Sequence, residues 1–475
     1  MYSALIKTMR NITGFLLVLL LAGLGTRMAA AQATASNPNF IIIFTDDQGY
    51  GDLGCYGHPT IRTPHIDKMA AEGQKWTNFY AAANVCTPSR AALLTGRLPI
   101  RSGMCGDGRR VLFPDSDSGL PATEKTIAEV LKEKGYSTAA IGKWHLGHLP
   151  PYLPTSHGFD TYYGIPYSND MDRDTAVAYK ESFLHPETAY FQVPLMRNTE
   201  VIERPADQST ITRRYTQEAV KYISKNKKKP FFLYLAHSLP HVPLFASPGF
   251  RGKSERGLYG DVIEEIDWSV GQILATLKKE GLDKNTYVIF TSDNGPWAIF
   301  NEHGGSAGPL FGAKGTGYEG GVRVPAVFWA PGKIKPAVIS EIGSTLDILS
   351  TISKLAGAAL PGDRVYDGYD LSPLLRGERA TPRQEMYYYH GTRIFAARKG
   401  DYKLYFYKNN PLGYPEQMEK LEQYQLFNLQ HDPSERYDLA GKLPEVIKEI
   451  EDMVQQHKAS VVPVESRLEK RIVKQ

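Results

Sequence analysis

The sequence predicts an α/β fold, in which a large, mostly parallel sheet is flanked by helices and is followed by a smaller α+β region with an antiparallel sheet. Short apolar runs alternate with amphipathic stretches from Asn39 onward, which is the rhythm of β-α-β units. The apolar runs are nearly continuous, as expected for strands that are buried on both faces of a parallel sheet. With 475 residues, 42% of them hydrophobic and 22% charged, the chain is long enough for one large core and a smaller second one.

The large sheet is expected in a first domain at residues 36–379. The predicted elements of this domain are the strands Phe40–Phe44, Ser137–Ile141, Phe231–Leu235 and Tyr287–Phe290 and the helices Ile127–Lys134 and Val262–Lys279. Open α/β sheets bind ligands outside the carboxyl ends of their strands. The polar residues that follow these strands are therefore the first candidates for a functional site.

A second domain is expected at residues 380–475, after a change in composition that follows Leu371–Gly377. Alternating residues predict antiparallel strands at 387–389, 395–398 and 402–407, and a helical period covers 443–459. The many tyrosines of these strands are suited to stacking on a sugar, but alternating aromatic residues in a small sheet more often serve packing.

Charge and cysteine content exclude two classes of protein. The 55 basic and 51 acidic residues give a formal net charge of +4, which is too even a balance for a protein that binds nucleic acid by neutralising phosphates. Three cysteines, Cys55, Cys86 and Cys105, are too few for a disulfide-rich scaffold, and their odd number leaves at least one unpaired. Whether Cys55 pairs with Cys105 is open at this stage.

Residues 1–31 have the pattern of a secretory signal peptide. A basic segment with Lys7 and Arg10 precedes the apolar run Gly14–Gly25, and Ala29–Ala31 supplies small residues for cleavage. A membrane anchor is the alternative, but the apolar run is shorter than the roughly 20 residues that span a bilayer. We therefore expect export with cleavage and no stable membrane insertion afterwards.

Two predicted strands end in pairs of oxygen-bearing side chains. Asp46 and Asp47 follow the first strand, and Asp293 and Asn294 follow the strand at Tyr287–Phe290. One such pair alone is more often a turn or a helix cap. Two pairs at the same edge of a sheet provide the oxygen ligands that a hard divalent cation requires. Calcium is preferred over zinc because all donors are oxygen atoms, and magnesium is the less favoured alternative.

Cys86-Thr87-Pro88-Ser89-Arg90 opens a predicted helix, with Thr87 or Ser89 placed to cap it. A buried cysteine before a capped helix would explain the pentapeptide alone, although a helix N-terminus also favours an anion beside residue 86. Together with Thr95-Gly96-Arg97 downstream, the segment resembles the signature of the sulfatase family in the alkaline-phosphatase superfamily. The resemblance implies an alkaline-phosphatase-like fold and a catalytic sulfatase domain at residues 36–379.

The resemblance also implies a particular chemistry at residue 86. In the family, a maturation enzyme oxidises this cysteine to Cα-formylglycine, and the hydrated aldehyde is the nucleophile. One hydroxyl of the hydrate attacks sulfur to form a covalent sulfate ester, and deprotonation of the other hydroxyl restores the aldehyde and expels sulfate. A serine or cysteine would remain sulfated. By the same resemblance, residue 86 also binds the metal and Arg90 steadies the hydrate.

The segment Gly142–Gly147 follows a predicted strand and matches a second family motif. In an extended chain Lys143 and His145 face one way, while Trp144 faces the core. This arrangement suits a cation that binds sulfate and a base that removes the second hydroxyl proton.

Two further positions match the family pattern. His241, in a His-Val-Pro context, matches a histidine that hydrogen-bonds the leaving-group oxygen, with His237 as the competing candidate. Lys314 lies in the glycine-rich segment Gly312–Arg323 and matches a lysine that contacts the sulfate oxygens. This segment also contains a G-x-G-x-x-G pattern, but it precedes a predicted strand, whereas a dinucleotide site needs the pattern between a strand and a helix.

The segments 157–160 and 164–170 are similar to the branch of the family that contains arylsulfatase A and N-acetylgalactosamine-6-sulfatase. Ser168 matches a position that hydrogen-bonds sulfate in that branch. Asn169 and Asp170 are expected near the substrate, with an ordinary polar loop as the alternative.

The sequence therefore predicts a calcium-dependent sulfuric ester hydrolase that is exported by a bacterium to the periplasm or beyond the cell. The preferred substrate is a sulfated carbohydrate, cleaved in exo fashion, and aryl sulfates are the alternative. A phosphomonoester or phosphonate hydrolase of the same superfamily and an inactive protein that binds sulfated glycans are the competing functions. The required partner is the enzyme that converts Cys86.

Overall fold

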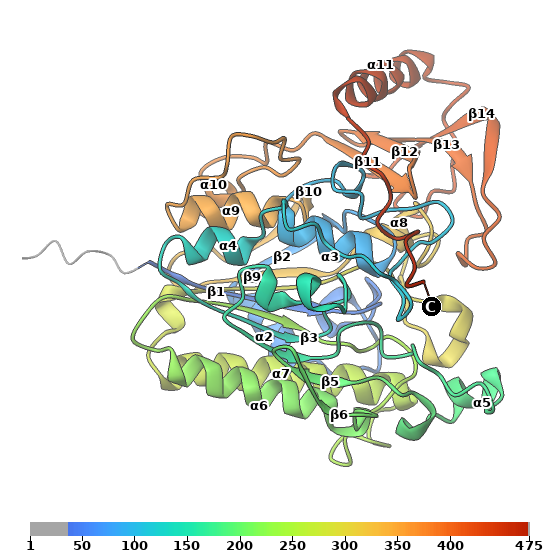
Figure 1. Ribbon diagram of the computed structural model, residues 1–475. Coiled ribbons are helices and arrows are strands. Elements are labelled where there is room, and N and C mark those ends of the chain that lie inside the picture. The colour runs from blue at the N-terminus through green and yellow to red at the C-terminus, as the bar shows by residue number, and fades with distance from the viewer. Residues whose placement is uncertain (1–36, 474–475) are drawn as a thin grey trace, which may run out of the picture. The chain divides into compact units, whose positions relative to one another are not determined.

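The computed structural model describes residues 37–473, and the predicted signal peptide at residues 1–31 lies outside them. From Pro38 onward the described chain belongs to one compact unit (Figure 1). Between residues 37 and 473, no helix combines the length and the apolar character needed to cross a membrane. All three cysteines lie in this range and are free, so Cys55 and Cys105 do not pair.

A 10-stranded sheet forms the centre of the protein, in the order β10-β2-β9-β8-β1-β7-β3-β4-β5-β6. Its strands are β1 (Asn39–Thr45), β2 (Gln74–Tyr80), β3 (Ser137–Gly142), β4 (Thr161–Gly164), β5 (Leu195–Arg197), β6 (Glu200–Glu203), β7 (Phe231–Ala236), β8 (Thr286–Ser292), β9 (Ala326–Trp329) and β10 (Ala337–Ser344). The five middle strands β8-β1-β7-β3-β4 are parallel, whereas β9 runs antiparallel to β8 and β2. This confirms the predicted fold class.

Helices cover both faces of this sheet (Figure 1). On one face lie α2 (Pro64–Glu72), α6 (Ile211–Lys225) and α7 (Gly257–Lys279), and on the other α3 (Cys86–Thr95), α4 (Ile127–Lys132), α9 (Asp347–Leu355) and α10 (Ser372–Leu375). The side chains of β1 alternate between the two faces of the sheet: Ile41 and Ile43 enter one core, and Phe40, Ile42 and Phe44 enter the other. Both faces are apolar, so helices are needed on each of them. Two short helices, α5 (Tyr179–Leu184) and α8 (Glu319–Val322), lie in connecting segments.

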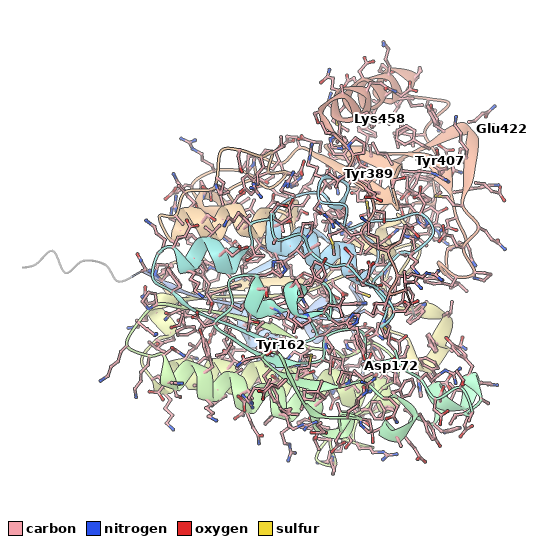
Figure 2. The ribbon with its side chains drawn as sticks, viewed as in Figure 1. Tyr162, Asp172, Tyr389, Tyr407, Glu422 and Lys458 are labelled. Carbon is pink, nitrogen blue, oxygen red and sulfur yellow. The ribbon has the colours of Figure 1, made fainter. Side chains whose placement is uncertain are left out.

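The C-terminal region forms a separate antiparallel sheet of four strands, in the order β11-β12-β13-β14, with α11 (Pro444–Ser460) packed against it. Its strands are β11 (Glu385–His390), β12 (Arg393–Lys399), β13 (Tyr402–Lys408) and β14 (Glu419–Asn428). Tyr389 on β11 reaches α11 (Figure 2), where its hydroxyl lies 2.9 Å from Nε2 of His457. The predicted antiparallel strands and helix are present, and β14 is an additional strand that the sequence pattern did not indicate.

Buried charges join the two sheets. Nζ of Lys403 on β13 lies 2.8 Å from Glu319 of α8 and 3.4 Å from Glu435. The hydroxyl of Tyr80, at the end of β2, donates to Glu319 at 2.6 Å. The C-terminal sheet therefore holds α8, the short helix that follows the segment carrying Lys314.

Two local expectations are wrong. Neither Thr87 nor Ser89 caps α3, because Cys86 is itself the first helical residue and the N-cap position is Val85. The Thr87 hydroxyl instead donates to the carbonyl of His145 and accepts from the amide of Leu112. The chain at His145 is also not extended, since its φ of 58° lies in the left-handed region. Trp144 is nevertheless buried in the core as expected.

Candidate active site

Four neighbouring strands deliver the site residues at one edge of the sheet. Asp46 and Asp47 follow β1, Asp293 and Asn294 follow β8, Lys143 follows β3, and the segment with His241 follows β7. These strands are adjacent and parallel, in the order β8-β1-β7-β3, so their carboxyl ends coincide. The position agrees with the general location of ligand sites in open α/β sheets.

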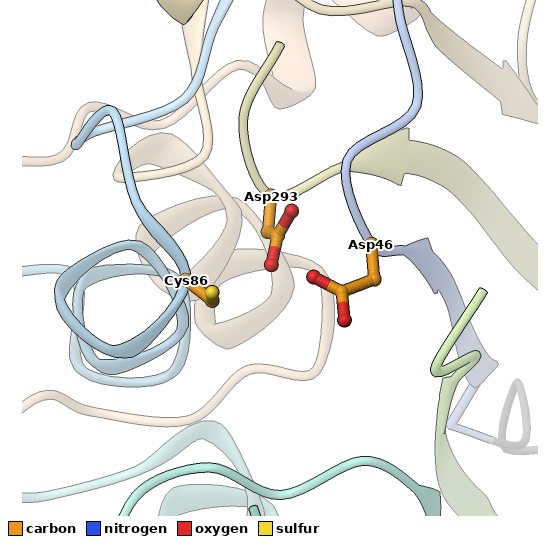
Figure 3. A group of neighbouring side chains, drawn as sticks. All are labelled: Asp46, Cys86 and Asp293. Carbon is orange, nitrogen blue, oxygen red and sulfur yellow. The ribbon is translucent and has the colours of Figure 1, made fainter. Parts of the chain in front are cut away.

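Asp46, Cys86 and Asp293 form the centre of the site, and their side chains point toward one another (Figure 3). One potential ligand atom from each lies within 4.8 Å of the others. Asp47 joins this group through Asn294, whose Nδ2 donates to Asp47 Oδ1 at 2.7 Å. Among the described residues, Oδ1 of Asp46 and Oδ1 of Asn294 are buried without a hydrogen-bond partner. Buried oxygens that lack partners are the donors that a hard cation requires, so the group fits calcium or magnesium.

Three buried cations surround these carboxylates. Nη2 of Arg90 lies 2.7 Å from Asp293 and 3.3 Å from Asp46. Nζ of Lys143 contacts Asp46 at 2.5 Å, and Nζ of Lys314 contacts Asp47 at 2.8 Å. Each of the three acidic side chains is thus paired with at least one of the three basic side chains.

Burial and pairing set the pKa values of the acidic groups. Burial acts to raise the pKa of Asp46, but the charges of Lys143 and Arg90 hold it well below its usual range. For Asp293 burial prevails, assisted by the negative charge of Asp46, and raises the pKa to about 7. Burial likewise raises the pKa of the Cys86 thiol to about 11.

The two histidines of the site have different surroundings. Nε2 of His145 lies 2.9 Å from the carbonyl of Leu112, and its Nδ1 has no hydrogen-bond partner among the described residues. Nε2 of His241 lies 3.6 Å from Asp47, and its Nδ1 donates to the carbonyl of Val242. Burial, with Lys143 beside His145 and Lys314 beside His241, holds both pKa values well below the usual range.

His237, the competing histidine, lies outside this group. Its Nε2 is 3.4 Å from Oγ of Ser269 on α7, and its ring packs against Tyr215. Burial lowers the pKa of His237 to about 4. The structure therefore brings His241, and not His237, to Asp47 and to the lining of the cavity.

The three residues expected near the substrate are placed differently from one another. Ser168 accepts a hydrogen bond from Nζ of Lys143 at 3.0 Å. Asp170 is half-buried, and its Oδ1 is enclosed without a hydrogen-bond partner within the described chain. Both line the cavity above the site. Asn169 does not: its amide donates to the carbonyls of His241 and Pro243, at 3.4 and 3.1 Å. Asn169 thus supports the His241 segment from beneath.

A cavity of about 810 Å³ opens above Cys86 and is lined by His145, His241 and Lys314. Its remaining wall contains residues that the sequence did not indicate: Arg109, Arg110, Asp115, Arg173, Trp297 and Tyr414. Trp297 follows Asp293 by four positions, so its position just after β8 could have indicated that it lies near the site. Tyr414 lies in the connection between β13 and β14, and no nearby sequence motif indicates that it lines the cavity.

The fold and this site define the class of the protein: an α/β protein with a buried group of carboxylates, a cysteine and cations at the carboxyl edge of a parallel sheet. The profile of the sulfatase family matches residues 38–358, and that of the C-terminal region of aryl-sulfatase matches residues 381–475. The chain therefore belongs to the sulfatase family and is a sulfuric ester hydrolase.

Relatives and solved structures agree with this assignment. Human arylsulfatase A is 41% identical over 457 residues, which cover 90% of this chain and 89% of that protein. N-acetylgalactosamine-6-sulfatase of Canis lupus familiaris is 38% identical, with 96% and 92% covered. The structure of PsFucS1 sulfatase from Pseudoalteromonas sp. has a TM-score of 0.80 at 30% identity and covers 94% of both chains. Ps i-CgsB in complex with k-i-k-neocarrahexaose has a TM-score of 0.74 at 29% identity, with 92% and 95% covered. The resemblance to the arylsulfatase A branch is thus confirmed.

Proposed function

We propose that the protein hydrolyses sulfate monoesters of carbohydrates in a calcium-dependent reaction, with Cys86 converted to formylglycine. The observation that carries the proposal is the buried group of Asp46, Cys86 and Asp293, whose ligand atoms lie within 4.8 Å, surrounded by the three fixed cations.

Asp46, Asp47, Asp293 and Asn294, together with residue 86, would hold the calcium ion. When bound, the ion would stabilise negative charge on the sulfate oxygens and on the attacking oxygen. The three carboxylates and the three cations are equal in number, so a divalent cation would add positive charge to the site and favour an anionic ester.

The side chains around residue 86 would divide the remaining work. Lys143, Lys314 and His241 would bind the sulfate group, with His241 next to the leaving-group oxygen. Arg90 would steady residue 86, and the unpartnered Nδ1 of His145 would take a proton to release the sulfate. Ser168 would hydrogen-bond sulfate beside Lys143, and Asp170 would face the substrate.

Metal removal tests the calcium assignment. Treatment with a chelator should abolish sulfate release, and added Ca²⁺ should restore it more fully than Mg²⁺. Elemental analysis of the treated protein is the control. Full activity in protein shown to be free of metal would contradict the assignment.

Substrate comparison and mass spectrometry test the reaction itself. We expect turnover of p-nitrophenyl sulfate to exceed that of p-nitrophenyl phosphate and of a phenylphosphonate ester, and a clear preference for phosphate would contradict the proposal. The peptide that contains residue 86 should carry the mass of formylglycine. An unconverted thiol in native, inactive protein would favour a binding protein instead.

The carbohydrate assignment, the location and the domain boundaries belong to the proposal as well. A relative of this chain was solved in complex with an oligosaccharide, and the cavity of about 810 Å³ is far larger than a sulfate group needs. We infer that the chain is exported by a bacterium. We also infer that a formylglycine-generating enzyme of the same organism converts Cys86. The domains at 36–379 and 380–475 stay a prediction.

A further inference from the structure

The catalytic cavity has a wall that the sulfate-binding residues do not use. Trp297 and Tyr414 come from distant parts of the chain, and both line the cavity. Their ring centroids are 5.6 Å apart with the planes inclined by 55°, so the two rings meet at an angle. We call this pair the aromatic corner.

Trp297 lies beside the residues expected to hold the ester. Its ring centroid is 5.2 Å from that of His241, and Nζ of Lys314 lies 4.3 Å from the ring. Phe300 packs edge-on against the indole at 4.9 Å and fixes its orientation. A group attached to the ester oxygen beside His241 would therefore meet Trp297 first.

Tyr414 reaches the same point from the C-terminal sheet. Its ring packs on Gly315, where an added Cβ would come within 3.0 Å of the tyrosine ring. The neighbouring Gly413 approaches so closely that a Cβ there would lie 1.9 Å from the carbonyl oxygen of Lys314. The Tyr414 hydroxyl makes no hydrogen bond within residues 37–473 and is not enclosed, so it is available to a ligand.

Another part of the cavity rim is polar. Arg109 forms two hydrogen bonds of 2.7 Å to Asp115, and Asp172 (Figure 2) and Arg173 lie on the segment between β4 and α5. Arg173 donates to the carbonyls of Asp174 and Val177 and has no carboxylate partner in the described part of the chain. A cavity lined by both an aromatic corner and hydrogen-bonding groups matches a pyranose ring, which has an apolar face and hydroxyl groups at its edge. A plain aryl group would make no use of the polar rim.

We propose that the aromatic corner of Trp297 and Tyr414 binds the first sugar ring of the leaving group. This inference rests on the proposed sulfatase function and names the part of the molecule that selects its substrate. The two residues pack against the apolar face of the sugar, and the Tyr414 hydroxyl and the charged rim bind its hydroxyl groups.

The experiment compares a substrate that fills the corner with an anion that does not. The probes are 6-O-, 4-O- and 3-O-sulfated monosaccharides as substrates and inorganic sulfate as a competitive inhibitor. In Trp297→Ala and Tyr414→Ala, KM for the preferred monosaccharide should rise about three- to tenfold. The inhibition constant of inorganic sulfate should change by less than about twofold, because packing against the sugar ring contributes nothing to it. Tyr414→Phe, which keeps the ring, should retain most of the affinity.

Tyr407→Ala is the matched control, since Tyr407 lies on the same hairpin (Figure 2) outside the cavity lining. An unchanged KM in both alanine variants would overturn the inference. A parallel rise in the sulfate inhibition constant would also overturn it, because the rings would then act by holding Lys314 and His241. Hydrolysis of aryl sulfates but of no sulfated sugar would refute the proposed sugar binding by the aromatic corner, while the sulfatase function would stand. Absence of sulfate release from every ester would refute the function itself.

Discussion

At the scale of single residues, the neighbours of each side chain decide its state more than its own chemistry does. Asp46 and Asp293 are both fully buried, yet cations hold the pKa of Asp46 low while that of Asp293 rises to about 7. His237 and His241 lie four positions apart, and only His241 faces the cavity. The residue type therefore indicates which chemical role a side chain could have. The neighbouring groups determine whether the side chain has the charge and position for that role.

The two histidines give a prediction at this scale. His241→Asn should lower kcat more for sulfated sugars than for p-nitrophenyl sulfate, because a poor leaving group depends more on the residue beside its oxygen. The expected difference is on the order of tenfold or more, within the range for acid catalysis. His237→Asn should affect both substrates equally and should act through stability, since His237 contacts Ser269 in the core. Steady-state kinetics with both substrates checks this, and equal losses in His241→Asn would contradict the assignment.

At the scale of elements, the site depends on the connections between strands. The five parallel strands only bring the strand ends together, and the connections provide Cys86, Lys314 and Tyr414. Gly413 shows how tightly two connections meet, because it touches the carbonyl of Lys314. The β13–β14 connection thus helps to position Lys314.

Gly413→Ala should lower kcat by displacing Lys314, as the added Cβ would lie 1.9 Å from the Lys314 carbonyl oxygen. Gly400→Ala is the matched control, because both glycines have positive φ, of 80° and 55°, and a Cβ at Gly400 meets nothing within 4 Å. Both variants should lose about 1 kcal/mol of stability through backbone strain. A loss of kcat confined to Gly413→Ala, measured in folded protein, supports the contact, and equal kcat values in the two variants would argue against it.

The packing of α11 gives a prediction about pH. The His457 ring stacks on Tyr387 at 3.7 Å, and burial lowers its pKa from 6.5 to about 4. Between these two values the unfolded chain binds the proton and the folded chain does not. The stability contribution of His457 is therefore complete above about pH 6.5 and is lost as the pH falls toward 4, by no more than about 3 kcal/mol. Other buried histidines titrate too, so the test is the difference in unfolding free energy between wild type and His457→Phe as a function of pH. This difference should be constant above about pH 6.5 and should shift in favour of the variant as the pH falls toward 4.

At the scale of the whole molecule, the antiparallel sheet is a structural part of the catalytic unit. Lys403 is fully buried and joins Glu319 and Glu435, and Arg398 on β12 contacts Tyr80 of the large sheet. Burial raises the pKa of Glu435 to about 7, whereas the charges of Lys403 and Arg323 overcome burial and lower that of Glu319 to about 2. Separate unfolding of the two sheets would expose these paired charges, so we expect one cooperative transition.

Lys403→Met should therefore destabilise the entire protein, because Glu435 loses its cationic partner and Glu319 keeps only Arg323. A cost of about 3–5 kcal/mol is typical of breaking a buried pair. Lys399→Met on the neighbouring strand is the control, since its pair with Glu449 is about half exposed, and it should cost less than about 1 kcal/mol. Urea unfolding followed by two probes measures both values. A second, separate transition in Lys403→Met would show that the sheets fold independently.

Local sequence was sufficient for the fold class and for most of the residues that the structure brings together at the site. Buried strands such as Phe40–Phe44 are continuous apolar runs, and the motif residues Asp46, Cys86, Lys143 and Lys314 lie in short, ordered segments. Patterns of this kind can be recognised without a structure because each depends only on residues that are close in sequence.

Only the tertiary structure decided which side chains share a cavity. It separated His241 from His237, placed Asn169 beneath the site, left Cys55 and Cys105 unpaired, and brought Tyr414 against Trp297. The physical reason is that these contacts join segments far apart in the chain. Their geometry depends on how two sheets pack and not on any local propensity. The sequence by itself therefore determined the chemistry of this protein, and the packing of its distant segments determined the shape of the cavity in which that chemistry takes place.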